Sequence, residues 1–299
     1  MKGSLKQIKR TIKGLIRLSR YRDYQENVVI ATLLGLLFSG TDITSVSLLR
    51  FGVVLIANLL GVGFSYMIND IEDASDDALI TARSSRNPIS DGTLSPRIGY
   101  LASFFFAGLS AFFYFILGFL PFLLGISSLI LGALYSWRAV RLKRIPVLDL
   151  ISHGLMLGVL QLSCAFYVFV PFAGFSVAWL LPAIFVLSIS IHDELYNEIR
   201  DVEIDRKVGI IHTASIIGEK AASFIMNFFL LLAGLTIFYS IANRFIPWWF
   251  IVLLCGSYIL FLGYRHSQGL KLRGELQKPL LQMGILSILV LILIRAFEI

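Results

Sequence analysis

Apolar residues in this chain come in long blocks separated by short polar stretches. A helix needs about 20 mostly apolar residues to span a bilayer. The blocks therefore predict an all-α, multi-pass membrane protein with about nine transmembrane helices. The predicted helices lie at about 24–40, 46–68, 98–117, 119–136, 148–170, 174–196, 221–242, 247–264 and 279–297. The composition agrees, since 57% of the residues are hydrophobic, against about 45–50% in soluble domains.

Lysine and arginine are distributed unevenly between the two sides that this topology predicts. With a cytoplasmic N-terminus, the arm before the first helix and the loops after helices 2, 4, 6 and 8 hold 23 of the 26 basic residues. Cytoplasmic loops of membrane proteins carry such an excess. We therefore expect a multi-pass protein of the plasma membrane with its N-terminus inside.

The N-terminal arm, residues 1–22, carries eight basic residues and no acidic one. Its apolar residues recur at helical spacing and are Leu5, Ile8, Ile12, Leu15 and Ile16. This pattern predicts a basic amphipathic helix that lies on an anionic lipid surface. Membrane lipids are thus an expected partner, whereas nucleic acid is not.

A nine-residue pattern, N-[D/E]-I-x-D-x-x-x-D, occurs twice, at residues 69–77 and 197–205. Each copy follows a predicted membrane helix and lies on the predicted cytoplasmic side. Side chains four apart share one helix face. Those that do so are Asn69, Asp73 and Asp77 in the first acidic motif and Asn197, Asp201 and Asp205 in the second. The repeat predicts one domain, residues 1–299, with two motif-bearing halves at about 23–145 and 146–299.

The stacked carboxylates predict a metal site, because they repel each other unless a cation lies between them. Oxygen ligands without histidine or cysteine favour Mg²⁺, which usually completes its shell with water and substrate phosphates. Two clusters predict two Mg²⁺ ions that hold a diphosphate between them. Nearby cationic side chains would also bind the diphosphate, and they include Arg20, Arg22, Arg83, Arg86, Arg138, Arg141, Lys143 and Arg144.

Taken together, these features resemble the UbiA superfamily of intramembrane prenyltransferases over most of the chain. Residues 69–77 match the family's N-D-x-x-D-x-x-x-D motif, and residues 201–205 match its D-x-x-x-D. Residues 86–92 are similar to its R-P-[LI]-x-x-G segment with an asparagine inserted, and residues 135–143 are similar to its Y-S…K segment. The resemblance implies a single all-helical domain around a central cavity.

The resemblance also implies roles for individual residues. The implied metal ligands are Asn69, Asp73, Asp77, Asp201 and Asp205. The groups implied to bind the diphosphate are Asn69, Asn197, Arg20, Arg86 and Lys143. The implied catalytic residues are Asp70, Asp73, Asp77, Asp201, Asp205 and Tyr135, of which Tyr135 would line the site and interact with a developing carbocation.

The expected reaction is Mg²⁺-dependent transfer of a prenyl group from a polyprenyl diphosphate to a hydrophobic acceptor. Positive charge would stabilise the departing diphosphate, and an apolar cavity would keep water from the allylic cation. A base then removes a proton from the product, and Asp70, Asp193 and Glu194 are equivalent candidates by sequence.

Other functions and several acceptors stay open on sequence grounds. The same motifs serve a membrane terpene cyclase, and a transporter or a non-catalytic prenyl-lipid-binding protein are alternatives of another class. Residues 197–201 resemble a segment of naphthoate prenyltransferases, whereas residues 86–88 and 144–149 resemble carotenoid-elongating members. The acceptor is therefore open between aromatic quinone precursors, carotenoids and glycerol lipids.

Overall fold

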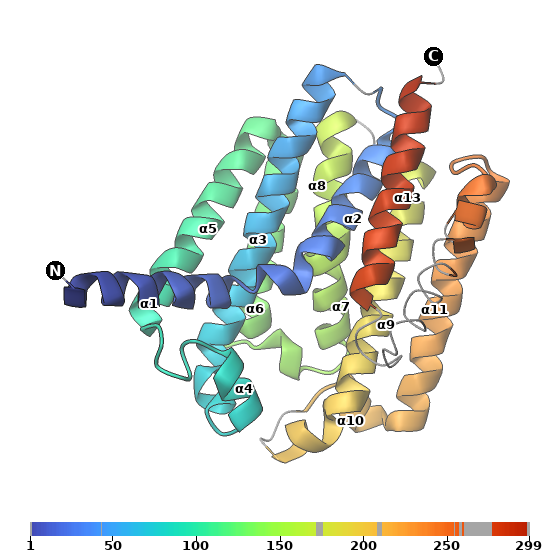
Figure 1. Ribbon diagram of the computed structural model, residues 1–299. Coiled ribbons are helices and arrows are strands. Elements are labelled where there is room, and N and C mark those ends of the chain that lie inside the picture. Colours follow the sequence, from blue (N-terminus) through green and yellow to red (C-terminus); the bar gives the residue numbers. More distant parts are fainter. Residues whose placement is uncertain are drawn as a thin grey trace.

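The computed structural model describes residues 2–42, 44–171, 176–207, 211–253, 255–256, 259 and 277–297. Regular structure in this part of the chain is helical, and the long helices run side by side as a bundle (Figure 1). The helices are α1 (Lys2–Ser19), α2 (Tyr21–Ser39), α3 (Ser45–Asp77), α4 (Thr81–Arg86), α5 (Pro96–Leu117), α6 (Phe119–Ser136), α7 (Leu148–Gly154), α8 (Leu160–Phe169), α9 (Val177–Lys207), α10 (Thr213–Ile217), α11 (Glu219–Ala242) and α13 (Gln277–Phe297). The all-α prediction is confirmed.

Six helical stretches of the described chain are long and apolar enough to cross a membrane. They are Val46–Asp77, Pro96–Leu117, Phe119–Ser136, Leu148–Phe169, Val177–Glu203 and Glu219–Ala242. The predicted segments 24–40 and 279–297 form α2 and α13, and α13 contains a shorter apolar stretch, Leu281–Ile294. Segment 247–264 lies largely outside the described residues. The count of nine membrane helices therefore stays a prediction.

Two predicted helix ends are wrong. We expected the acidic motifs to lie in loops after helices that end at residues 68 and 196. Instead α3 and α9 continue through the motifs to Asp77 and Lys207. Neither motif contains glycine or proline, the residues that most strongly end helices. Each motif is thus a helical extension of a membrane helix.

The segment 148–170 is not one regular helix. Between α7 and α8 the turn η2, Leu155–Val159, has π-helical hydrogen bonding. Single π-helical turns inside helices are frequent at functional sites. This turn carries Leu157 and Gly158, both of which line the cavity described below.

A polar network in the middle of the bundle fixes how four helices pack. Asn58 on α3 donates hydrogen bonds to Thr32 on α2 at 2.8 Å and to the carbonyl of Gln161 on α8 at 3.1 Å. It accepts one from Tyr114 on α5 at 2.6 Å. All these side chains are buried. Hydrogen bonds between membrane helices are typically worth about 0.6–2 kcal/mol each.

The N-terminal arm forms α1, which lies across the bundle (Figure 1). Leu18 is fully buried against the bundle, and Arg17 forms a 2.8 Å ion pair with Asp91. The outer face carries Ile8, Ile12 and Ile16, each more than half exposed. Exposed isoleucines between basic residues agree with a helix at a lipid surface.

The contact between α5 and α6 gives a testable packing prediction. A Cβ atom added at Gly125 would lie 2.1 Å from a ring carbon of Tyr114, which is fully buried. Because a buried ring cannot move away freely, we expect Gly125→Ala to destabilise the protein by about 1–3 kcal/mol. Gly108→Ala is the matched control, because nothing lies near its added Cβ. Thermal unfolding in detergent would compare the two, and equal midpoints would contradict this packing.

Candidate active site

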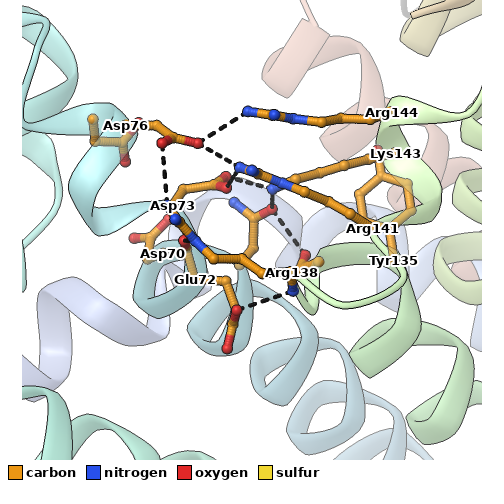
Figure 2. Close-up of polar contacts among 12 residues, drawn as sticks. Asp70, Glu72, Asp73, Asp76, Tyr135, Arg138, Arg141, Lys143 and Arg144 are labelled. Carbon is orange, nitrogen blue, oxygen red and sulfur yellow. Dashed lines mark hydrogen bonds and ion pairs between the residues drawn. The ribbon is translucent and has the colours of Figure 1, made fainter. Parts of the chain in front are cut away.

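The first acidic motif lies at the C-terminal end of α3, where the helix dipole disfavours negative charge. Its carboxylates therefore need cations close by. Those that meet Asp73 and Asp76 come from the basic loop, residues 137–144, between α6 and α7 (Figure 2). The expectation that these cations bind a diphosphate stays a prediction, and in this structure they contact the carboxylates of the motif instead.

Lys143 and Arg141 converge on Asp73. The Lys143 ammonium lies 2.5 Å from one carboxylate oxygen of Asp73 and donates to Asn69 Oδ1 at 2.8 Å. The Arg141 guanidinium donates to the other Asp73 oxygen at 2.6 Å. Burial lowers the pKa of the Lys143 ammonium, although the adjacent Asp73 carboxylate opposes this shift. Two cations thus meet at one carboxylate of the motif.

Asp76 binds three arginines of the basic loop, which sequence reasoning missed. Its carboxylate lies 2.6 Å from Arg141, 3.0 Å from Arg144 and 3.1 Å from Arg138. Figure 2 shows the three guanidinium groups approaching Asp76 together. Asp76 occupies a variable position of the repeated pattern, so the pattern did not single it out. The sequence did offer one signal for Asp76, namely its position among the closely spaced carboxylates of residues 70–77.

Arg141 turns back toward α3 through an unusual backbone conformation. Its φ of 53° lies in the left-handed region, which non-glycine residues adopt in only a few per cent of cases. Such strain costs about 1–3 kcal/mol and clusters at functional sites. The two short ion pairs of Arg141 with Asp73 and Asp76 offset this cost.

Arg20 connects the first acidic motif to the junction of α1 and α2. Its φ of 47° is also left-handed, and its guanidinium forms a 3.0 Å ion pair with Asp70 and a 2.9 Å ion pair with Asp23. It also lies over the Tyr66 ring, 4.8 Å from the centroid, which is a cation–π geometry. The predicted site residues Arg20 and Asp70 are therefore in contact.

The segment after the first acidic motif folds back on it through Asn87. This buried amide donates to the backbone oxygen of Asp70 at 2.6 Å and to the Asp77 carboxylate at 2.9 Å. Arg83 interacts electrostatically with Asp77. Arg86 is exposed and lies 3.9 Å from Asp23. Of these residues, the inserted asparagine makes the closest contacts with the motif.

The second acidic motif makes different contacts. Asp201 is paired with the neighbouring Arg200 at 2.9 Å, and Asn197 lines the cavity. Glu198 is buried and accepts a 2.8 Å hydrogen bond from the backbone of Ala214 at the start of α10. The predicted site residue Asp205 has a side chain outside the described residues.

A buried carboxylate, Asp149, holds α10 next to the second acidic motif. It accepts hydrogen bonds from the Thr213 backbone at 2.7 Å and from the Thr213 hydroxyl at 2.6 Å. We expect Asp149→Ala to cost about 3 kcal/mol, because it leaves three buried donors unpaired, the two of Thr213 and the backbone N–H of Leu150. Thermal unfolding would show this loss. Asp42→Ala is the control, since Asp42 is exposed, and equal midpoints for both variants would contradict an anchoring role.

The oxygen donors of the first acidic motif suit Mg²⁺ by their chemistry. Asn69, Asp73 and Asp77 offer only oxygen, and the buried Asp70 Oδ2 has no hydrogen-bond partner among the described residues. In the same part of the chain, no three Asp, Glu, His or Cys side chains converge in a metal-binding geometry. Lys143 and Arg141 neutralise Asp73 in this structure instead.

A cavity of about 510 Å³ opens between α2 and α9, and Tyr66 of α3 reaches its lining. Along both α2 and α9 its lining changes from polar to apolar. The polar part includes Asp23, Asn27, Tyr66, His153, Ser190, Asp193 and Asn197, and the apolar part includes Leu34, Phe38, Phe185, Phe250 and Ile288. Arg20 links the two sites, because it pairs with Asp70 of the motif and with Asp23 of the lining. A ligand with a polar head and an apolar tail suits this shape.

Tyr135, another predicted site residue, lies at the end of α6. Its hydroxyl donates a 3.0 Å hydrogen bond to Glu194 on α9. Its ring centroid lies 6.2 Å from that of His153, which lines the cavity. Tyr135 is therefore not among the residues that line the cavity, but it contacts His153, which is.

Comparison with known proteins places the chain in a family. The family model described as the UbiA prenyltransferase family matches residues 28–275, whereas the search of curated proteins gives no match. A UbiA homologue from Archaeoglobus fulgidus bound to GPP and Mg²⁺ is similar, with a TM-score of 0.68 and 20% identity over 96% of this chain and 100% of that chain.

Two further solved structures share the fold. An apo UbiA homologue from Aeropyrum pernix K1 has a TM-score of 0.71 and 17% identity, covering 92% of this chain and 98% of that chain. A digeranylgeranylglyceryl phosphate synthase has a TM-score of 0.64 and 17% identity, covering 96% and 99%. The family match spans most of the sequence, and the chain therefore belongs to the UbiA prenyltransferase family.

Proposed function

We propose that this protein transfers a prenyl group from a polyprenyl diphosphate to a hydrophobic acceptor and releases diphosphate. The observation that carries the proposal is the meeting of Lys143 and Arg141 with Asp73 of the first acidic motif, which Arg20 connects to a cavity with an apolar interior. The solved homologue bound to GPP and Mg²⁺ supports a prenyl diphosphate as donor.

The basic loop would bind the diphosphate. Lys143 and Arg141 present ammonium and guanidinium groups whose charge stabilises the negative charge that develops on the leaving group. Asn69, Asp73 and Asp77, with Asp201 and Asp205, would hold Mg²⁺, which adds positive charge against the same diphosphate when bound. Lys143 and Arg141 would then leave the Asp73 carboxylate and bind phosphate oxygens instead.

The cavity would hold the prenyl chain and exclude water. An allylic cation that meets water is lost as an alcohol, so a dry apolar lining favours transfer. Tyr66 lies at the polar part of the lining and turns its ring toward Arg20. Arg86 and Arg83 lie on the segment that follows the first acidic motif, where they would attract the diphosphate.

We further propose that this site faces the cytoplasm of a plasma-membrane protein. The motif-bearing ends of α3 and α9 lie at the same end of the bundle as α4 and α10 (Figure 1). The basic loop contacts the end of α3, in line with the excess of positive charge on cytoplasmic segments.

The test uses full-length protein in lipid nanodiscs with Mg²⁺ and prenyl diphosphates of several lengths. Diphosphate release and new lipid masses are measured with and without a total membrane lipid extract. We expect release that requires the extract and yields a prenylated lipid. Release without extract, giving a cyclised product, would assign a terpene cyclase. Absence of release from folded protein would overturn the proposal in favour of transport or lipid binding.

A further inference from the structure

Four polar side chains from three helices form a continuous chain at the polar part of the cavity. The Ser190 hydroxyl on α9 lies 2.9 Å from His153 Nδ1 on α7. His153 Nε2 lies 3.4 Å from one carboxylate oxygen of Glu194. The other oxygen of Glu194 accepts the 3.0 Å hydrogen bond from Tyr135 on α6.

Only part of this chain faces the cavity. Ser190 and His153 line it, whereas Glu194 lies behind them with 17% of its side chain exposed. Ser190 and Glu194 are four residues apart, so α9 presents both on one face, toward the imidazole on α7. Going away from the cavity, the groups are therefore the Ser190 hydroxyl, the His153 imidazole, the Glu194 carboxylate and the Tyr135 phenol.

The contacts suit one tautomer of the imidazole. A carboxylate only accepts hydrogen bonds, so a proton on Nε2 of His153 would face Glu194 across the 3.4 Å contact. Nδ1 would then have a lone pair and would accept from the Ser190 hydroxyl. The Tyr135 hydroxyl holds the carboxylate in place from the far side. This is the arrangement of a hydroxyl, a base and a group that orients the base.

We propose that Ser190, His153 and Glu194 are the relay that removes the proton from the acceptor. The inference rests on the proposed function and answers a question that the sequence leaves open, namely which group serves as base. Every acceptor class considered loses one proton as the prenyl group joins it, so the relay does not depend on which acceptor is used.

The step balances without any further reactant. The allylic C–O bond breaks, and its electron pair leaves with the diphosphate. A bond forms between the allylic carbon and the nucleophilic atom of the acceptor, which becomes acidic. Its proton passes to Ser190 Oγ while the hydroxyl proton of Ser190 passes to His153 Nδ1. The Glu194 carboxylate stabilises the resulting imidazolium charge.

The two other candidate bases are engaged differently. Asp70 is paired with the Arg20 guanidinium at 3.0 Å and is not among the residues that line the cavity. Asp193 lines the cavity and lies 3.0 Å from His192 Nδ1. Asp193 is thus the rival that an experiment has to test directly.

The experiment uses full-length protein in nanodiscs with Mg²⁺, geranyl diphosphate and a total membrane lipid extract as the source of acceptor. Ser190→Ala and His153→Gln are expected to lower the yield of prenylated lipid on the order of 10²-fold, a typical contribution of general base catalysis. Diphosphate release should continue, with geraniol as the product, because water captures the cation. Ser190→Thr keeps the hydroxyl and should restore the adduct.

The control is Ser188→Ala, on the same helix but outside the cavity lining, and it should behave as the original protein does. A purely structural role would lower diphosphate release and adduct together, which would overturn the relay. Unchanged adduct in Ser190→Ala and His153→Gln, or loss of adduct only in Asp193→Asn, would also overturn it. Failure of the original protein to release diphosphate would instead refute the proposed function.

Discussion

Replacing Asp73 with asparagine is expected to lower the rate of diphosphate release on the order of 10³-fold, the upper range for loss of one strongly stabilising electrostatic contact. Asp73 is the carboxylate on which Lys143 and Arg141 converge, at 2.5 and 2.6 Å. It is also a proposed metal ligand, so the amide removes a charge needed by both the cation and the basic loop. The shape of the side chain is nearly unchanged.

The measurement is a Mg²⁺ titration of diphosphate release, with thermal unfolding as a check on folding. We expect Asp73→Asn to need more Mg²⁺ and to stay slow at saturation. Asp42→Asn is the matched control, because Asp42 is exposed and lies in the loop between α2 and α3. Full activity of folded Asp73→Asn at ordinary Mg²⁺ would remove this residue from the site.

Lys143→Met should lower kcat/KM for the prenyl diphosphate about 10²-fold, equivalent to about 2.7 kcal/mol. Methionine is unbranched and of similar length, so packing should be little affected. Asp73 keeps its ion pair with Arg141, and Asn69 keeps its 3.0 Å hydrogen bond from Ser136. What disappears is the ammonium. We expect kcat to fall more than KM rises, because diphosphate charge grows in the transition state.

The control for this change is Lys220→Met, because Lys220 is exposed at the start of α11. Steady-state kinetics over a range of prenyl diphosphate concentrations separate kcat from KM. The double variant Asp73→Asn with Lys143→Met should be much less impaired than the product of the two single effects, since the two residues act through one contact. Strictly multiplicative losses would show that they act independently.

The sequence predicted well those features that depend on neighbours along the chain. The apolar blocks predicted the helical fold, and the four-residue spacing predicted that Asn69 and Asp73 share a helix face, where Lys143 contacts both. The helix ends were predicted less well, because membrane thickness limits only the apolar part of α3 and α9. Nothing in the polar motif forces a helix to stop.

Partners that come from distant segments could not be predicted. Asp76 and Arg141 are 65 positions apart, and their contact depends on the left-handed turn at Arg141. In the sequence, Asn87 was only an insertion in the segment 86–92 that resembles a UbiA-family motif, yet it binds both Asp70 and Asp77. The contact between His153 and Ser190 spans 37 positions and two helices. Such contacts follow from helix packing rather than from local pattern.

By itself the sequence determined the class of the molecule, a helical membrane protein with two acidic motifs, because hydrophobic periodicity and motif spacing are local properties of the chain. The tertiary structure decided which cation meets which carboxylate and which polar groups line the cavity. Those choices depend on how helices far apart in sequence cross and on where loop backbones turn. A side chain is only a few ångströms long, so it can act on a ligand only if helix packing places it close to that ligand.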